Sequence, residues 1–160
     1  MNRALPLLAA LLLGAPALSA DNADGPGEIA ADKAKAMVEY RHAFYEGLGK
    51  HMKMSAMIIK GEVDRPGDLA KHARALHEAS TSIPHLFPKG TEPSAHKSEA
   101  KPEIWTDWKG FMEKQKAFET ASAKFVEVAE QGDMKAAGAQ FRKVGMSCGG
   151  CHDGYRVDED

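Results

Sequence analysis

The chain has 160 residues, which suit one ordinary domain, and its formal net charge of −2 at pH 7 is close to neutral. This balance argues against nucleic acid or an anionic membrane as a partner and leaves a net-basic protein partner open. Only two cysteines occur, and a bridge between them would close so small a loop that it would contribute little to the stability of the chain.

Residues 1–20 are typical of a secretory signal peptide. A short basic start is followed by an apolar run from Leu5 to Leu13 and by mostly small residues up to Ala20. The apolar run is too short to span a bilayer, and no later stretch approaches membrane length. We therefore expect cleavage after Ser19 or Ala20, export to the periplasm without stable membrane insertion, and one domain in residues 21–160.

The first helix of that domain is predicted from Glu28 to Lys60, after a flexible lead-in over residues 21–27. Gly61 is expected to end it. One face of this helix is marked by residues at alternating steps of four and three, namely Met37, Arg41, Phe44, Leu48, Met52, Ser55 and Ile59.

A second helix is predicted to start at Asp64-Arg65-Pro66, where proline fits a first turn, and to stop before Pro84. Its inward stripe is Leu69, Ala73, Leu76, Ser80 and Ile83. Residues 84–101 are rich in proline and poor in apolar side chains, so they predict a long connection. In a compact bundle such a connection has a role of its own or crosses the end of the bundle.

A third helix is predicted from Pro102 to Gly132, and Asp133 is expected to cap the fourth. The third helix has the clearest stripe, which is Ile104, Trp108, Phe111, Gln115, Phe118, Ser122, Phe125 and Ala129. The fourth continues with Met134, Ala137, Phe141, Val144, Cys148 and Cys151. Because strand-like alternation is absent, the sequence predicts an all-α fold, an antiparallel four-helix bundle with one shared core.

The string from Cys148 to His152 has the C-x-x-C-H pattern of covalent haem attachment. Each thiol can form a thioether with one vinyl group of haem, and the adjacent histidine can then ligate the iron. Both cysteines continue the apolar stripe of the fourth helix, so they are expected to point into the bundle. The motif therefore predicts one haem c, bound through Cys148 and Cys151, with His152 as the proximal iron ligand.

Two other uses of the cysteine pair fit the sequence less well. A thioredoxin-like dithiol needs a βαβ context, which the helical periodicity does not offer. A structural zinc site needs four ligands, and the chain has no second cysteine pair.

With this motif near its C-terminus, a signal peptide and four predicted helices, the chain resembles the class II c-type cytochromes, the cytochrome c prime family. The similarity covers nearly all of residues 21–160. It includes Tyr40-Arg41, Gly49-Lys50-His51-Met52, Ile58-Ile59-Lys60-Gly61, Ile83-Pro84-His85-Leu86-Phe87-Pro88-Lys89-Gly90 and Pro102-Glu103-Ile104-Trp105. The resemblance implies a periplasmic monohaem protein and leaves a homodimer through the first two helices open. No acid–base pair or nucleophile constellation suggests an enzyme.

The residue that faces the iron opposite His152 decides the function of such a protein. In low-spin relatives a methionine of the first helix ligates the iron, whereas in the cytochrome c prime branch the iron is five-coordinate. Matching the chain through Arg41 and the string at Gly49 implies that Tyr45 takes this position. A neutral phenol, with a pKa of ~10, is a poor iron ligand, so Tyr45 is expected to wall an open pocket. Plain core packing explains Tyr45 equally well.

Two functions follow from these alternatives. The first interpretation is electron transfer with a redox partner protein, in which the haem iron cycles between ferric and ferrous states. The alternative is a five-coordinate iron that binds a small gas such as nitric oxide or carbon monoxide.

Two arginines also match the family pattern. The resemblance implies that Arg41 lies near the haem propionates and that Arg156 borders the proximal face. For each of them, a solvated side chain is the competing interpretation.

Other candidate ligands lie on the first helix. Met37 and Met52 are in phase with its core stripe, so packing explains them, and His42 is expected at the surface. The cluster of His51, Met52, Met54 and Met57 has ligand types that suit copper, but helical geometry spreads the four around the helix and argues against a single site.

Replacing both cysteines, Cys148→Ala with Cys151→Ala, is expected to abolish covalent haem, because no other thiol is available. Intact-mass measurement and haem staining after denaturation check this in cells that assemble c-type cytochromes. Haem that stayed attached to the denatured double variant would contradict the attachment prediction.

Overall fold

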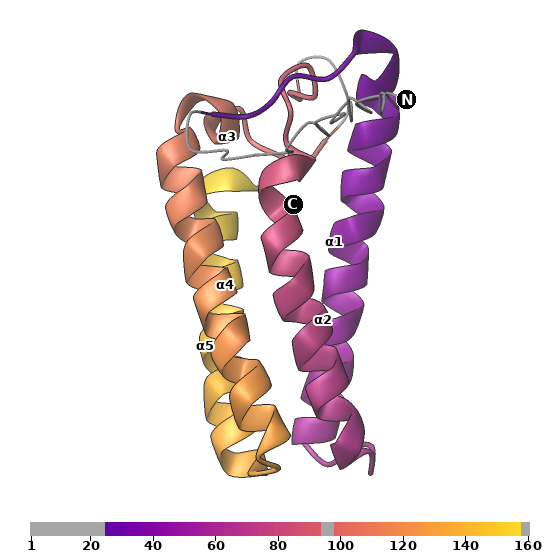
Figure 1. The fold of residues 1–160 in the computed structure, drawn as a ribbon, viewed down its shortest axis with the longest axis vertical. Helices are drawn as coiled ribbons and strands as arrows, with labels where there is room; N and C mark the ends of the chain where they lie inside the picture. The colour runs from indigo at the N-terminus through magenta and orange to yellow at the C-terminus, as the bar shows by residue number, and fades with distance from the viewer. Residues whose placement is uncertain (1–24, 94–97, 158–160) are drawn as a thin grey trace, which may run out of the picture.

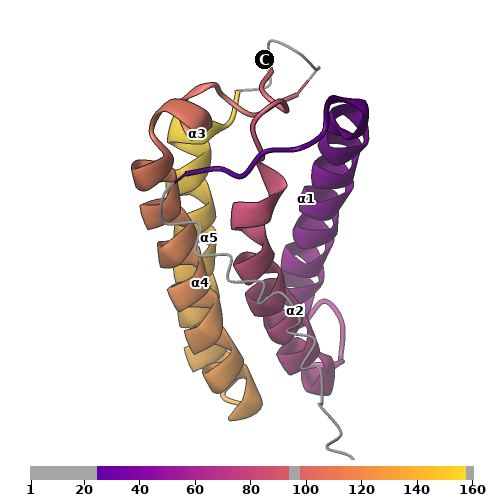
Figure 2. The same ribbon diagram turned by 45° about the horizontal axis from the view of Figure 1, so that its top comes forward.

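The structure, a computed structural model, describes residues 25–93 and 98–157, so the predicted signal peptide lies outside the described residues. Four long helices form a bundle in which α1 lies beside α2 and α4 lies beside α5 (Figures 1 and 2). Their bounds are Ala31–Ile59 for α1, Leu69–Ser82 for α2, Trp108–Glu130 for α4 and Met134–Tyr155 for α5. The predicted antiparallel four-helix bundle is confirmed. None of the described helices is long and apolar enough to cross a membrane.

The helix ends follow the local signals in the sequence. Gly61 and Gly132 take positive φ values of 71° and 75°, a region in which glycine costs no side-chain strain. Asp133 accepts a hydrogen bond from the backbone N–H of Ala136 at 3.0 Å and so caps α5 as predicted. The predicted start of the second helix is a 3-10 turn, η2 (Pro66–Asp68), that leads directly into α2.

The prediction of one continuous third helix is wrong. The segment divides into α3 (Glu103–Thr106) and α4, and Asp107 between them has a non-helical backbone, with φ −125° and ψ 56°. The Asp107 carboxylate accepts hydrogen bonds from Gly110 N at 3.1 Å and from the Tyr155 hydroxyl at 2.8 Å. The break therefore lets one carboxylate cap α4 and tie it to the end of α5.

The connection between α2 and α3 crosses one end of the bundle, as Figure 1 shows. It begins with the 3-10 turn η3 (Ile83–Leu86), and its later part pairs with the end of α5. Lys101 N donates to Tyr155 O at 2.9 Å, and Val157 N donates to Glu99 O at 2.8 Å. The connection thus covers the end of the bundle where the C-x-x-C-H motif lies.

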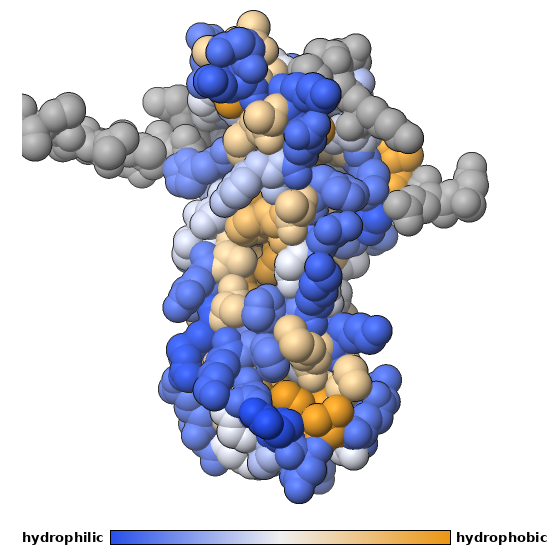
Figure 3. Space-filling view, turned by 90° about the vertical axis from the view of Figure 1, so that its right-hand side faces the viewer, coloured by the Kyte–Doolittle hydropathy of each residue, from blue (hydrophilic) through white to orange (hydrophobic). Residues whose placement is uncertain are grey.

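The shared core is densest along α4. All eight residues of the predicted stripe from Ile104 to Ala129 are buried. On α1, by contrast, Phe44, Leu48 and Met52 are only partly buried, although they are in phase with the buried Arg41 and Ser55. Figure 3 views the molecule from the α1 side and shows apolar colour between hydrophilic flanks. The α1 stripe therefore has fewer protein neighbours than its apolar residues predict.

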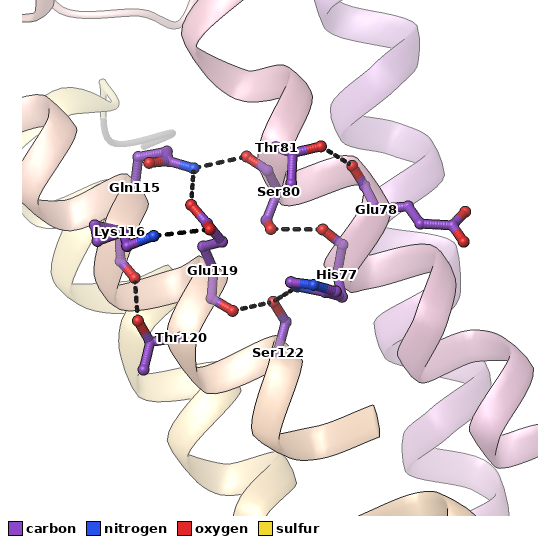
Figure 4. Close-up of polar contacts among 9 residues, drawn as sticks. All are labelled: His77, Glu78, Ser80, Thr81, Gln115, Lys116, Glu119, Thr120 and Ser122. Carbon is purple, nitrogen blue, oxygen red and sulfur yellow. Dashed lines mark hydrogen bonds and ion pairs between the residues drawn. The ribbon is translucent and has the colours of Figure 1, made fainter. Parts of the chain in front are cut away.

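Polar side chains join α2 to α4 within the core, as Figure 4 shows. Gln115 Nε2 donates to Ser80 O at 2.8 Å and to Glu119 Oε2 at 3.2 Å. Ser122 Oγ donates to Glu119 O at 3.0 Å and lies 3.4 Å from His77 Nδ1. These contacts satisfy buried polar atoms and fix α2 against α4, so the two helices form a rigid wall.

Candidate haem-binding site

A cavity of about 930 Å³ lies inside the bundle, at the upper end of the ~300–1,000 Å³ range of ligand and cofactor pockets. Residues from α1, α2, α4 and α5 and from the connection line it. Its apolar lining includes Leu48, Met52, Leu76, Ile83, Phe87, Ile104, Phe111 and Phe118. The cavity explains why the α1 stripe is only partly buried, since this stretch of α1 faces space and not another helix.

The three residues of the haem motif lie together on this cavity. Cys148, Cys151 and His152 all line it from the last two turns of α5, and both cysteines pack against the hydrophobic core. The prediction that the cysteines point into the bundle is confirmed. Gly149 has no side chain to occupy the space between them.

Burial keeps the two thiols protonated. It raises the pKa of Cys148 and, together with the neighbouring Cys148 charge, raises the pKa of Cys151 to about 11, with a smaller opposing effect from Lys114. The two cysteines are not bridged to each other, so both are available for attachment. The thiolate is the form that reacts with disulfides. The raised pKa values therefore disfavour thiol–disulfide exchange by these two cysteines at neutral pH.

His152 lines the cavity at its exposed edge. Partial burial and then the nearby Arg156 lower the pKa of its imidazole, against smaller opposing effects of Asp153 and Glu99, which favours the neutral form. A neutral imidazole has the free lone pair that an iron ligand needs.

Tyr45 lines the cavity from α1. Its ring makes an edge contact with Phe44 at 5.7 Å between centroids and lies 6.3 Å from Phe87. Burial raises the pKa of the phenol well above its usual value, and Arg41 opposes this rise. Tyr45 is therefore a buried phenol, held neutral, on the same cavity as both cysteines of the haem motif.

Arg41 is 4% exposed, so the interpretation as a solvated arginine is wrong. Its Nη1 donates to Leu86 O at 3.1 Å and to Thr91 Oγ1 at 3.0 Å, and its Nη2 donates to Thr91 O at 3.2 Å and to Ser98 Oγ at 3.0 Å. The guanidinium also lies 4.7 Å from the ring centroid of Phe87. Arg41 thus ties α1 to the connection at the cavity. Its role toward a propionate stays a prediction.

The cavity has further charged neighbours. Arg156 lines it and is ion-paired with Glu99 at 2.9 Å, but 42% of its side chain is exposed, so its role at the proximal face stays a prediction. Lys114 also lines it and lies close enough to Cys151 to lower the pKa of that thiol. Lys114 was not predicted from the sequence as a residue of the site. Its position directly before Gln115 of the α4 stripe could have indicated that it lies beside the core.

The other candidate ligands separate into two groups. Met52 and His42 line the cavity, and His42 is exposed and ion-paired with Glu46 at 3.4 Å. Met37 packs against the core without lining the cavity, and Met54 is 37% exposed. The structure therefore disperses the methionines of α1, as the helical spacing predicted.

These residues fit haem. The porphyrin is a flat apolar ring with two carboxylates, and the cavity offers apolar walls with cationic side chains from Arg41, Lys114 and Arg156. Two thiols and a neutral imidazole lie on one wall for attachment and ligation. An all-α bundle with this motif on its last helix, beside a cavity of cofactor size, defines the class of helical-bundle c-type cytochromes.

Comparisons with known proteins agree with this class. The family model for cytochrome c' matches residues 36–156. Cytochrome c' of Rhodospirillum rubrum is 35% identical over 129 residues, which cover 81% of this chain and 86% of that protein. Cytochrome c-554 of Cereibacter sphaeroides is 36% identical over 132 residues, which cover 79% and 96%. The chain belongs to the cytochrome c' family.

Solved structures of the family match the fold. A nitric oxide complex of a variant cytochrome c prime from Alcaligenes xylosoxidans superposes with a TM-score of 0.71 and 30% identity, covering 82% of this chain and 99% of that one. A carbon monoxide-bound variant from the same organism has a TM-score of 0.69, 30% identity and the same coverage. Members of the family carry one covalent haem c, are periplasmic and are not enzymes.

Replacing Arg41 by methionine is expected to destabilise the protein by about 3 kcal/mol, because it removes charged hydrogen bonds and leaves the carbonyl groups of Leu86 and Thr91 without their donor. Urea unfolding followed by circular dichroism measures the change. Arg142→Met on the exposed face of α5 is the matched control and should shift stability by less than ~0.5 kcal/mol. Equal unfolding midpoints for the two variants would contradict a structural role for Arg41.

Proposed function

We propose that this chain is a periplasmic monohaem protein that binds a diatomic gas, nitric oxide or carbon monoxide, at an open position on the haem iron. Export would depend on residues 1–20 as a cleaved signal peptide. The observation that carries the proposal is the position of Tyr45, whose phenol lines the cavity from α1.

Three residues would hold the cofactor. Cys148 and Cys151 would form the two thioethers, and His152 would ligate the iron. When bound, haem would supply an iron that can bind a diatomic gas. The aromatic side chains of Phe87 and Phe111 would exclude water from the ring, because both are buried and line the cavity.

Tyr45 supports an open position for two reasons. Its raised pKa keeps the phenol protonated across the neutral and moderately alkaline range, and only the deprotonated form is a good iron ligand. Its ring contacts with Phe44 and Phe87 hold it as a bulky wall. A wall of this kind leaves room for a small gas and hinders larger ligands.

The names of the relatives support the same function. Several of the matched structures from Alcaligenes xylosoxidans are complexes of cytochrome c prime with nitric oxide or carbon monoxide. The chain covers nearly all of those proteins, so the comparison concerns the whole haem-binding fold.

Electron transfer to a redox partner protein is the second candidate function. The observation that favours it is Met52, whose thioether side chain lines the same cavity and is of the ligand type found in low-spin carriers. Met52 lies seven residues after Tyr45, about 10 Å further along α1. A methionine bond to iron would therefore require a different part of the cavity from the part that Tyr45 walls.

Absorption spectroscopy of the purified haem protein tests the proposal and separates the two functions. A high-spin spectrum that changes on adding nitric oxide or carbon monoxide to the ferrous protein is the expected result. A six-coordinate low-spin spectrum in both oxidation states, unchanged by either gas, would support the electron carrier instead.

Tyr45→Met is expected to convert the iron to a low-spin six-coordinate state, because the thioether reaches the position that the phenol walls. Carbon monoxide affinity should then fall at least ~10-fold, or about 1.4 kcal/mol, since the gas must displace a ligand. Tyr45→Leu is the matched control of similar size without sulfur and should stay high-spin. A Tyr45→Met spectrum identical to that of the Tyr45→Leu protein would show that residue 45 does not face the iron.

A further inference from the structure

Two histidines meet between α1 and α2, outside the haem cavity. His51 Nδ1 and His72 Nδ1 lie 3.0 Å apart, and their ring centroids are 5.3 Å apart with planes at 53°. Both side chains are partly buried, and neither residue lines the cavity of the candidate haem site. Neither the haem motif nor the proposed gas binding uses this pair.

The short distance fixes the protonation of the pair. Two imidazole nitrogens at 3.0 Å share one proton, because two facing N–H groups would clash and repel. One nitrogen therefore donates and the other offers its lone pair. A metal ion that binds both Nδ1 atoms takes the place of that shared proton, which moves through solvent to Nε2 of the donor ring.

The two Nδ1 atoms are close enough to bind one ion. Two ligands at about 2.05 Å from one ion are about 2.9 Å apart at ~90° and about 3.3 Å apart in a tetrahedral site. The observed 3.0 Å is also the length of an N–H···N hydrogen bond, so it is compatible with both geometries. Tetragonal nitrogen and oxygen coordination is typical of Cu²⁺ and Ni²⁺, and Cu²⁺ binds more strongly in the divalent series.

We propose that His51 and His72 bind one Cu²⁺ ion through their Nδ1 atoms and thereby join α1 to α2. Among the described residues, no group of three or more histidine, cysteine or acidic side chains could hold a metal ion, so water fills the remaining positions. The partner of His51 thus comes from another helix and not from the neighbouring methionines of α1. Met52, for example, lines the haem cavity instead.

One carboxylate lies near the pair on the α2 side. Asp68, one turn before His72, is ion-paired with Lys71 at 2.8 Å and with Arg65 at 2.7 Å. Lys71, which directly precedes His72, is therefore held by a carboxylate. This arrangement reduces the repulsion that a divalent ion would meet at His72.

Isothermal titration of the ferric haem protein with Cu²⁺ alone tests the site. One ion per chain is expected, and His51→Gln and His72→Gln should each weaken binding at least tenfold. His85→Gln is the matched control, since His85 is an exposed histidine that does not line the haem cavity, and it should bind as the unchanged protein does. The haem spectrum and circular dichroism confirm that each variant is folded.

A second measurement does not depend on the variants. The electron paramagnetic resonance spectrum of the added Cu²⁺ should show splitting from two nitrogen ligands, and Cu²⁺ should raise the melting temperature because it joins two helices. Equal Cu²⁺ affinity in all four proteins, or a spectrum with oxygen ligands only, would overturn the proposal. The bound Cu²⁺ would then be an adventitious ion only. The outcome is independent of gas binding at the haem, which needs neither histidine.

Discussion

The structure depends on how α1 is held. This helix packs on α2, yet part of its apolar face must stay away from α5 so that a cavity of about 930 Å³ persists between the four helices. A bundle without a ligand would leave Leu48 and Met52 beside an empty space of this size. Unfilled apolar cavities lower the stability of the folded state. The cofactor therefore supplies packing as well as chemistry, and the family's covalent haem c fits this requirement.

Contacts that are distant in sequence keep the cavity in shape. Arg41 bonds to residues 45 to 57 positions later in the chain and holds the connection against α1. Asp107 accepts from the hydroxyl of Tyr155 and holds α4 against the end of α5. The first anchor lies on the cavity lining and the second involves the residue three positions after His152, so both hold elements that surround the motif Cys148–His152. Pre-organisation of this kind reduces the ordering cost of binding a large ligand.

Local patterns were enough to predict much of this architecture. Helical periodicity predicted every buried residue of the stripe from Ile104 to Ala129, because one face of a helix that is apolar at this spacing has to be covered. The phase of Cys148 and Cys151 predicted that they face the interior, and the cavity lining agrees. The roles of these cysteines, of His152 and of Tyr45 toward the haem stay predictions.

Features set by tertiary contacts were beyond the sequence. The break at Asp107 depends on Tyr155, 48 residues away, and no local signal announces that hydrogen bond. The burial of Arg41 depends on Thr91 and Ser98 in the connection, whose path the sequence left open. The contact between His51 and His72 likewise depends on how α1 and α2 cross. In each case a polar side chain is satisfied by a partner that only the fold provides.

The central claim is that the iron keeps one face free behind Tyr45. Resonance Raman spectroscopy of the ferrous haem protein without added gas tests it most directly, because the marker bands report spin state and coordination number. The account predicts five-coordinate high-spin bands together with an iron–histidine stretch. Six-coordinate low-spin bands in the same sample would contradict it.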